Sequence, residues 1–362
     1  MRIALLTYST RPRGGVVHTL ALAEALAARG HDVDVWSLAR GEDAGFFRPV
    51  DPAVRVCLVP LPDVPDEGVG PRILRSIAAL GAAFAVEAPR RGYDVVHAQD
   101  CISANAVPDC VRTIHHLDVF TTPELAACHE RAIVRPRAHV CVSAAVADEV
   151  RAGWGIETTV IPNGIDGARF AAAGSDAAGR AAWAQRLGRY VLAVGGIEPR
   201  KGSEHLVGAM ALVQRREPGL RLVVAGGETL FDYRDYRARV LDRAAELGVV
   251  PELLGPVPDE QLPGLVAQAS AFAFPSVKEG FGMAAMEALA AGVPVVMRDL
   301  PVLREVFDGS VAFAHDEAEL ACGLLDAARA PDGRRVEAGR TLAARHTWQR
   351  AAAAHERFYA TL

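Results

Sequence analysis

Short runs rich in Val, Ile and Leu alternate along the chain with longer stretches rich in Ala and Leu. This alternation predicts parallel strands covered by helices. The chain opens with a predicted strand at Ile3–Thr7, a predicted helix at Val17–Arg29 and a second strand from Asp32. Gly30 directly follows the helix, where glycine is the expected stop signal. The opening therefore predicts a Rossmann-like unit.

The alternation then starts again in the second half of the chain. Strands are predicted at residues 3–7, 32–38, 54–59, 94–97, 112–115 and 140–143, and then at 190–194, 220–225, 253–254, 271–274, 294–297 and 311–313. The Ala-, Gly- and Ser-rich stretch Asp166–Gly188 separates the two sets and is predicted to be a linker. We expect two Rossmann-like α/β domains, with parallel sheets whose carboxyl ends bind ligand in a cleft.

Composition supports two folded domains and excludes several classes of protein. The chain has 362 residues, of which 51% are hydrophobic and 23% are charged, as in ordinary globular proteins. A net charge of −5 argues against a nucleic-acid partner, because such binding needs a basic surface. None of the six cysteines forms a C-x-x-C pair, so we expect no zinc or redox motif.

Hydropathy bears on location. The apolar run at the N-terminus is too short for a signal peptide. The most apolar stretch elsewhere, Ile77–Val86, falls short of the roughly 20 residues that a membrane span needs. We expect a cytoplasmic protein with its cysteines reduced, and leave a peripheral membrane contact and the oligomeric state open.

The segment Pro275–Glu287, which reads P-S-V-K-E-G-F-G-M-A-A-M-E, carries the sharpest chemical signal. It follows a predicted strand and opens a predicted helix. Gly280 and Gly282 let a ligand approach the backbone, and the first amides of the helix can hold a phosphate. Glu279 and Glu287 would lie roughly 12 Å apart along a helix. A phosphate cradle between two carboxylates points to a nucleotide sugar as the ligand.

This segment resembles the E-G-F-G-x-x-x-x-E signature of family 4 retaining glycosyltransferases, also described as glycosyl transferases group 1, which have the GT-B fold. Four further elements match that family in order. They are the glycine loop with His18, the "P-N-G" element at Pro162–Gly164, the turn at Val194–Gly202, and a C-terminal helix at Trp348–Tyr359. The resemblance implies an N-terminal acceptor-side domain at 1–168, joined by the C-terminal helix in 346–362, and a nucleotide-sugar domain at 169–345.

The resemblance also implies roles for individual residues. The residues expected at the reacting sugar and the leaving diphosphate are His115, Glu279, Lys201 and Arg200. Those expected to bind the donor are Gly15, Gly196, Gly280, Phe281, Gly282, Met283 and Glu287, with Glu287 on the ribose. Weaker acceptor-side candidates are Gly14, His18 and Asp118. The turn departs from the family pattern, because Gly196 and Ile197 stand where an arginine often follows the first glycine.

The implied reaction transfers a sugar, with retention of anomeric configuration, from a UDP-, GDP- or ADP-sugar to an unidentified acceptor. We expect no metal or other cofactor. Asp32-Val33-Asp34 matches the metal-binding D-x-D pattern, but it opens a predicted strand, at the end of the sheet opposite the ligand. Two alternatives stay open: a nucleotide-sugar epimerase of the same fold, and a non-catalytic two-domain protein that binds sugars or nucleotides.

Overall fold

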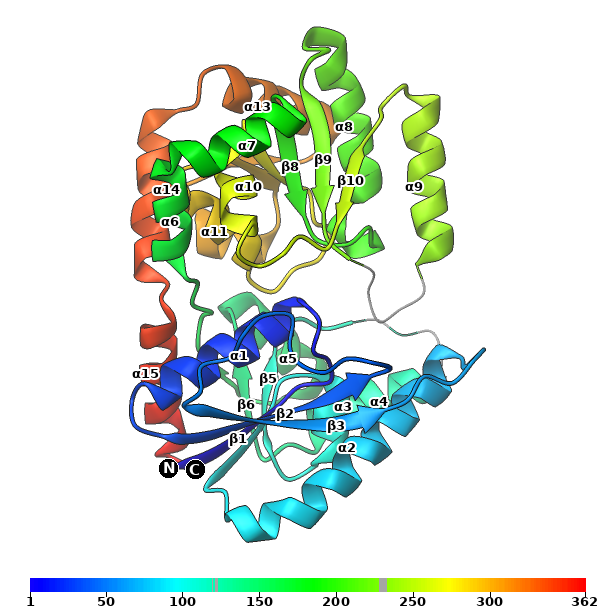
Figure 1. Cartoon of the computed structure of the whole chain (residues 1–362), viewed down its shortest axis with the longest axis vertical. Coiled ribbons are helices and arrows are strands. Elements are labelled where there is room, and N and C mark those ends of the chain that lie inside the picture. The colour runs from blue at the N-terminus through cyan, green and yellow to red at the C-terminus, as the bar shows by residue number, and fades with distance from the viewer. Residues whose placement is uncertain (119, 121–122, 228–232) are drawn as a thin grey trace. The chain divides into compact units, whose positions relative to one another are not determined.

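The computed structural model describes residues 1–118, 120, 123–227 and 233–362, and the chain forms two compact units. Unit 1 comprises Met1–Gly164 and Trp348–Leu362, and unit 2 comprises Ile165–Thr347. Each unit is built on one parallel sheet with helices packed against it (Figure 1). The predicted fold of two Rossmann-like domains is confirmed.

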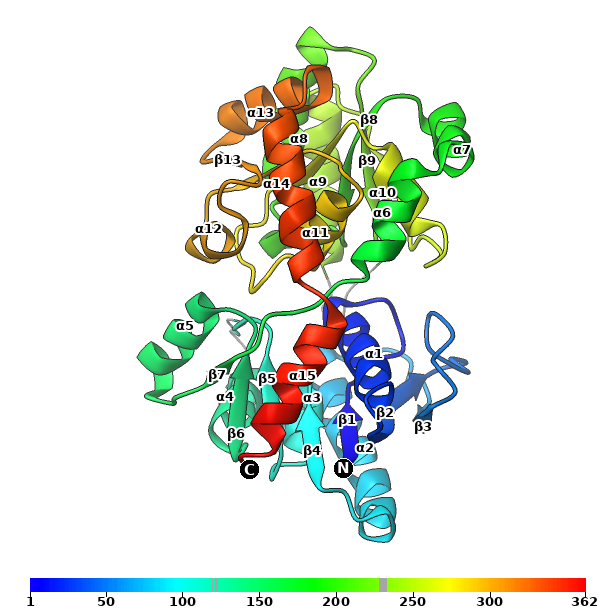
Figure 2. The same ribbon diagram turned by 90° about the vertical axis from the view of Figure 1, so that its left-hand side faces the viewer.

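Unit 1 contains a sheet with the strand order β3-β2-β1-β4-β5-β6-β7. Its strands are β1 (Arg2–Leu6), β2 (Asp32–Arg40), β3 (Val54–Leu61), β4 (Val95–Ala98), β5 (Val111–Ile114), β6 (Ala138–Cys141) and β7 (Thr159–Val160). Its helices are α1 (Gly14–Ala27), α2 (Val69–Arg91), α3 (Cys101–Ala106), α4 (Pro123–Val134), α5 (Ala144–Trp154) and the C-terminal α15 (Trp348–Tyr359). Figure 2 shows α15 lying beside α1, against which it packs.

Unit 2 repeats this topology with the order β10-β9-β8-β11-β12-β13. Its strands are β8 (Tyr190–Val194), β9 (Arg221–Ala225), β10 (Glu252–Gly255), β11 (Ala271–Phe274), β12 (Val295–Arg298) and β13 (Ala312–Ala314). Its helices are α6 (Gly167–Ser175), α7 (Ala177–Leu187), α8 (Ser203–Arg216), α9 (Arg234–Glu246), α10 (Leu262–Gln268), α11 (Met283–Ala290), α12 (Pro301–Phe307), α13 (Glu317–Arg329) and α14 (Gly333–Arg345).

The apolar strands form the core because helices cover them. Residues 3–6 of β1 and all of β11 are buried. Such strands read as continuous apolar runs rather than alternating ones, as expected for a parallel sheet. In both sheets the order reverses beside the first strand of the unit, between β1 and β4 and between β8 and β11. Ligands of doubly wound folds bind at the carboxyl ends of the strands at such a point.

The predicted linker is wrong, because most of Asp166–Gly188 is helical. The side chain of Asp166 accepts a hydrogen bond from the amide of Arg169 and caps α6. The side chain of Asp176 accepts bonds from two amides at the start of α7. Alanine has the highest helix propensity, and Asp is among the best N-caps. The composition that indicated a linker therefore builds two capped helices.

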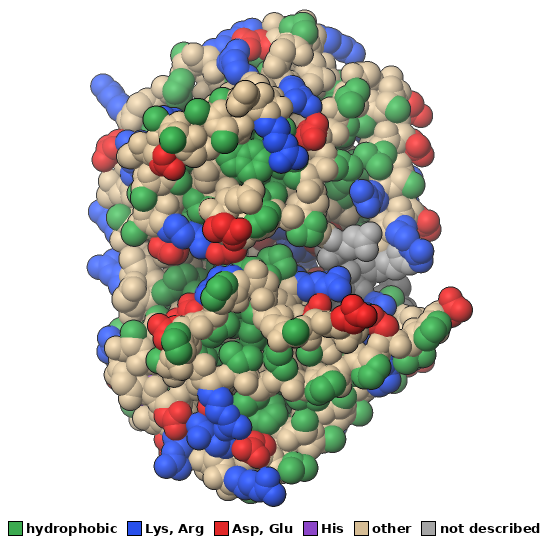
Figure 3. All heavy atoms as spheres, viewed as in Figure 1, with side chains coloured by type: hydrophobic (Ala, Val, Ile, Leu, Met, Phe, Trp, Pro, Cys, Tyr) green, Lys and Arg blue, Asp and Glu red, His purple; other side chains and the backbone are tan. Residues whose placement is uncertain are grey.

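The apolar stretch Ile77–Val86 belongs to a longer helix than the sequence indicated. α2 has 23 residues, and by length and composition alone it could cross a membrane, although core helices pass the same test. Only 22% of its most apolar window is buried, and Leu74 and Val86 are exposed. Figure 3 shows hydrophobic side chains at the surface along the lower right edge, where α2 runs in Figure 1. From the sequence alone the apolar stretch is too short to cross a membrane, and the 23 residues of α2 correct that estimate of length.

Candidate functional site

A cluster of charged side chains lies in unit 2 where β8 and β11 end, at the point where the strand order reverses. β8 leads into a 3₁₀ turn, η1 (Pro199–Lys201), and β11 leads into the loop before α11. Nζ of Lys201 lies 2.5 Å from Oε1 of Glu279, and Nη1 of Arg200 lies 3.3 Å from the same oxygen. The structure thus brings together three of the four residues expected at the reacting sugar and diphosphate.

A glycine lets these two segments approach each other. Gly202 has a φ of +66°, and a Cβ at this position would lie 2.1 Å from the carbonyl oxygen of Pro275. The amide of Val277 donates to the carbonyl of Arg200 at 2.8 Å, so the backbones are also joined. Any other residue at position 202 would push the turn away from the loop and separate the ion pairs.

Hydrogen bonds hold the cluster in one arrangement. The hydroxyl of Ser276 donates to Oε1 of Glu279 at 3.0 Å, and Nε of Arg200 donates to Oε2 of Glu198 at 3.1 Å. Burial lowers the pKa of Lys201, while the ion pair with Glu279 opposes that shift. Glu198 and Glu279 thus partly neutralise the charges of Arg200 and Lys201, whose side chains both reach Glu279. A more highly charged anion can replace these carboxylates as the partner of the two cations.

The glycine-rich segment opens α11 as predicted, and the helix begins at Met283. Gly282 is the N-cap with a φ of +99°, a backbone conformation that favours glycine. The side chain of Phe281 is 3% exposed, and its ring lies 5.5 Å from that of His346. Only the backbone of Phe281 is therefore available to a ligand. Glu279 lies in the loop, so the spacing of roughly 12 Å, which assumed that both glutamates lie on one helix, does not apply.

Glu287 lies on α11 in a partly buried position. Burial raises the pKa of its carboxyl to about 8, against the opposing effect of Arg169. Arg169 is itself paired with Asp259, with Nη1 2.5 Å from Oδ2. Among the described residues, no hydrogen bond to the Glu287 carboxyl is found. Its oxygens are therefore available to hydroxyl groups of a ligand.

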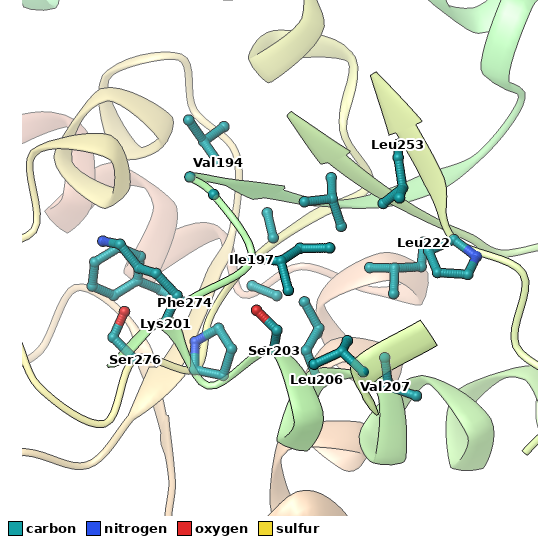
Figure 4. Close-up of a pocket in the computed structure, with 18 of the residues that line it drawn as sticks. Val194, Ile197, Lys201, Ser203, Leu206, Val207, Leu222, Leu253, Phe274 and Ser276 are labelled. Atoms are coloured by element: carbon teal, nitrogen blue, oxygen red, sulfur yellow. The ribbon is translucent and has the colours of Figure 1, made fainter. Parts of the chain in front are cut away.

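A mostly apolar pocket opens beside the charged cluster (Figure 4). It lies between β8, β9, β10 and α8, and its lining includes Gly196, Ile197, Ser203, Leu253 and Lys201. Nζ of Lys201 lies 5.3 Å from the ring centroid of Phe274, and the figure shows these two side chains adjacent to Ser276. The pocket therefore has mostly apolar walls, with the ammonium-bearing side chain of Lys201 as part of its lining.

In unit 1, His115 follows β5 at the carboxyl edge of the sheet and is partly exposed. Its Nε2 is buried and has no hydrogen-bond partner among the described residues. Burial lowers the pKa of His115 to about 3, helped by the charges of His116 and Arg112. A Cβ on Gly15 would lie 3.8 Å from Nε2 of His115. The site therefore presents a neutral imidazole beside a residue without a side chain.

Two expectations for the start of α1 differ from the structure. Gly14 and Gly15 are the first residues of α1 rather than part of a loop, and the hydroxyl of Thr19 donates to the carbonyl of Gly15 at 2.6 Å. His18 is only 1% exposed and its Nδ1 is paired with Asn163, so its surroundings are those of a core residue.

The other acceptor-side candidate lies in a more open position. Oδ1 of Asp118 lies 3.3 Å from Nε2 of His116, and both side chains are partly exposed. Both residues follow the end of β5 at Ile114, on the same edge of the sheet as His115. Asp118 is therefore placed where a ligand of unit 1 would bind, and its role stays a prediction.

Sequence reasoning overlooked two polar residues after β4. Gln99 is 1% exposed, and neither its Oε1 nor its Nε2 has a partner among the described residues. Asp100 caps α3 by accepting from the amide of Ser103 at 2.8 Å, and it also accepts from the amide of Tyr8 at 3.0 Å. Their position directly after a buried strand, at the strand-order reversal, was the signal that could have found them.

The D-x-D pattern is structural. Asp34 is fully buried and accepts hydrogen bonds from Arg91 at 2.8 Å and from the hydroxyl of Tyr93 at 2.5 Å. Asp32 pairs with the same arginine at 3.0 Å, and both aspartates lie at the amino end of β2, as expected. Across residues 1–118, 120, 123–227 and 233–362, no group of three or more His, Cys, Asp or Glu side chains could hold a metal ion.

Comparison with known proteins places both units in one family. Residues 12–169 match the family model described as "Glycosyltransferase Family 4", and residues 184–327 match "Glycosyl transferases group 1". A D-inositol 3-phosphate glycosyltransferase of Xylanimonas cellulosilytica is 30% identical over 411 aligned positions, covering 99% of this chain and 96% of the relative. A phosphatidyl-myo-inositol mannosyltransferase of Propionibacterium freudenreichii is 28% identical, with 96% and 92% coverage.

Solved structures agree on the fold. Sucrose-phosphate synthase from Thermosynechococcus elongatus matches with a TM-score of 0.79 at 22% identity, covering 99% of this chain and 98% of that one. HepE from Anabaena, in complex with UDP-glucose, matches with a TM-score of 0.78 at 18% identity over 100% of both chains. The two units thus define a protein of GT-B fold. The chain belongs to glycosyltransferase family 4, and it is a glycosyltransferase that uses a nucleotide-sugar donor.

Proposed function

We propose that this enzyme transfers a sugar, with retention of anomeric configuration and without a metal ion, from a nucleoside-diphosphate sugar to an acceptor hydroxyl. The observation that carries the proposal is the convergence of Lys201 and Arg200 on Glu279, where β8 and β11 end. Two fixed cations at a strand-order reversal, close to a helix N-terminus, suit a diphosphate.

We assign each part of the donor to a neighbouring group of residues in unit 2. The diphosphate meets Arg200, Lys201 and the first amides of α11, and the ribose hydroxyls meet the open carboxyl of Glu287. The apolar pocket beside Lys201 suits the flat faces of a base. The UDP-glucose bound to HepE supports a uridine nucleotide as the first donor to try, before GDP- and ADP-sugars.

The chemistry follows from where charge develops. As the glycosidic bond breaks, positive charge grows on the sugar ring and negative charge grows on the diphosphate. Fixed cations that meet the growing negative charge lower the barrier, as the donors of an oxyanion hole do. His115 stays neutral at pH 7 because burial holds its pKa at about 3. A neutral imidazole can hydrogen-bond a sugar hydroxyl without adding to the positive charge of the ring.

For the acceptor, we propose a polyhydroxylated compound of the inositol phosphate class. The support is the activity for which the relatives are named, such as the D-inositol 3-phosphate glycosyltransferase that aligns along 99% of this chain. Unit 1 offers neutral polar groups at the ends of β4 and β5, including the imidazole of His115 and the amide of Gln99, which has no partner within the described residues. Such groups suit hydroxyls.

A cytoplasmic location is also proposed. All six cysteines are free thiols, as expected in a reducing compartment. The exposed apolar side chains of α2 are compatible with a peripheral membrane contact. Fractionation of cells that express the protein would test both points. We expect the protein in the cytoplasmic fraction and not among the exported proteins, and a peripheral contact would place part of it in the membrane fraction.

One incubation separates the proposal from its alternatives. The purified enzyme is mixed with UDP-, GDP- and ADP-sugars, with and without inositol phosphates, and free nucleotide and products are followed by NMR. Nucleotide release that depends on an acceptor, with an α-linked product from an α-linked donor, is expected. Conversion of the sugar without an acceptor would identify an epimerase, and binding without turnover would identify a non-catalytic protein.

A further inference from the structure

His18 has an unusual set of neighbours for a core histidine. It lies on α1 of unit 1 and is 1% exposed. Its Nδ1 lies 2.9 Å from Oδ1 of Asn163. Its ring packs edge-on against Trp348, with centroids 5.3 Å apart, and against His115, with centroids 4.8 Å apart. One side chain therefore touches three segments that are far apart in the chain.

Two of these neighbours mark the places where the chain leaves unit 1 and returns to it. Unit 1 ends at Gly164 and resumes at Trp348, so Asn163 is the second-last residue before departure and Trp348 is the first after return. We call Asn163–Gly164 and Thr347–Trp348 the two crossings. Just beyond them, the amide of Ile165 donates to the carbonyl of His346 at 2.9 Å, and Ile165 bridges Thr347.

The third neighbour, His115, is the residue expected beside the donor sugar. Because Asn163 Oδ1 accepts the hydrogen bond, Nδ1 of His18 carries the proton. Burial lowers the pKa of His18, and so do the charges of the histidines that face it, which are His115 after β5, His355 on α15 and His97 on β4. His18 is therefore neutral, with one donor committed to Asn163.

We infer that His18 is a positioning residue that locks both crossings to His115, rather than a residue that binds the acceptor. The hydrogen bond holds the outgoing crossing, the ring contact with Trp348 holds the returning one, and the contact with His115 ties both to the end of β5. This inference rests on the proposed function only for the role of His115, because the lock itself is a property of the unliganded protein.

Two substitutions at position 18 distinguish a role in holding the two crossings from a role that only fills volume in the core. In His18→Asn, the amide Nδ2 stands close to the place of Nδ1 and can still donate to Asn163. His18→Leu fills the volume without a donor. His139 supplies a matched control, since it is also buried in unit 1 and its Nε2 donates to the carbonyl of Ile133 at 2.7 Å. Among the described residues, His139 has no hydrogen bond, ion pair or ring contact with either crossing.

Hydrogen-exchange mass spectrometry reads the lock without any activity. His18→Leu should raise exchange at least about fivefold in peptides that contain Asn163 and in peptides that contain Trp348, while His18→Asn keeps both close to wild type. His139→Leu should leave the crossings protected. Equal loosening of all unit 1 peptides in His18→Leu, or protection that persists at either crossing, would overturn the lock.

Kinetics test the link to the reaction. His18→Leu should lower kcat at least about tenfold and change KM for acceptor and donor less than about threefold, with partial recovery in His18→Asn.

The variant Asn163→Asp tests the same link through pH. It places a carboxylate on Nδ1 and favours protonated His18, so the acid limb of the profile of kcat against pH should move to higher pH by about one unit. A raised acceptor KM at unchanged kcat, or an unmoved acid limb, would contradict a positioning role. An inactive wild type with intact protection of the crossings would count against the proposed function alone.

Discussion

The ammonium group of Lys201 and the carboxylate of Glu279, 78 residues apart in sequence, are in contact, with Nζ 2.5 Å from Oε1. They come from loops that follow β8 and β11, which are neighbours at the strand-order reversal of unit 2. The pair holds a partly buried cation in a fixed place before any ligand arrives. A charge fixed in this way needs no reorganisation when the diphosphate leaves.

Lys201→Ala should lower kcat more than it raises the donor KM, because the charge that Lys201 meets grows in the transition state. Loss of one preorganised donor costs about 3–4 kcal/mol, or about 10²–10³ in kcat. Lys278 in the neighbouring loop, for which no ion pair is found among the described residues, is the control, and Lys278→Ala should keep kcat. A raised KM at unchanged kcat would make Lys201 a binding residue only.

Glu279→Gln tests the pair from the other side. If Glu279 acts mainly by holding Lys201, the double variant Lys201→Ala/Glu279→Gln should lose little more activity than Lys201→Ala alone. Steady-state kinetics of the four proteins give the coupling. Fully additive losses would show that Glu279 has its own contact with the sugar, as the family resemblance implies.

Glu287→Gln should weaken nucleotide binding about tenfold above pH 8, where the Glu287 carboxyl is ionised, because hydrogen bonds to a charged acceptor contribute about 1.5–3 kcal/mol. It should also alter the pH dependence of stability. Burial raises the pKa of Glu287 from 4.5 to about 8, so the folded protein holds an extra proton between these values. The free energy of unfolding of unliganded protein therefore falls as pH rises from about 5 to above 8. Denaturant titrations should show this fall in wild type and a smaller one in Glu287→Gln. Parallel curves of unfolding free energy against pH for the two proteins would show that burial does not raise the pKa of the Glu287 carboxyl.

The histidines of unit 1 predict the opposite trend at low pH. Burial lowers the pKa values of His18, His97, His115 and His355 below 6.5. The unfolded chain then binds more protons, so stability is retained above pH 6.5 and falls below it, by up to about 1.4 kcal/mol per pH unit for each residue. His355→Leu should reduce the slope between pH 6.5 and 5 in denaturant titrations. An unchanged slope would show that His355 is not held neutral in the folded state.

EDTA should leave activity intact, because the proposed site meets the diphosphate with Arg200, Lys201 and helix amides rather than a metal ion. The measurement is nucleotide release before and after chelation, with Mg²⁺ added back. Asp34→Asn should lower stability rather than activity, since Asp34 is buried and bound to Arg91 and Tyr93. Loss of activity in EDTA that Mg²⁺ restores would contradict the metal-free mechanism.

The fold could be predicted from the sequence because its strands are buried on both faces. Runs such as Tyr190–Val194 are apolar throughout, and the structure has β8 at these residues. Helix limits were less accurate where the deciding interactions are single side chains. Asp166 and Asp176 cap α6 and α7, and such caps outweighed the glycines and serines that indicated a linker.

The site could be predicted where a motif is local and less well where neighbours come from distant segments. The proximity of the turn at Arg200 to Glu279 follows from strand order, and it was expected from the family pattern. The burial of His18 depends on Asn163 and Trp348, which lie 145 and 330 residues away in sequence. Gln99 was missed because a single glutamine after a strand matches no motif, although neither of its amide atoms has a partner in the part of the chain that the structure describes.

The central claim is that unit 2 holds a nucleoside-diphosphate sugar, and a thermal-shift titration with UDP, GDP, ADP and their common sugar conjugates tests it most directly. Ligand that binds the folded state stabilises it by RT ln(1 + [L]/Kd), about 2.7 kcal/mol at a hundredfold excess over Kd. We predict a clear rise in Tm with one nucleotide family, which Lys201→Ala and Glu287→Gln both reduce. A well-folded sample whose Tm is unchanged by every nucleotide would contradict the claim.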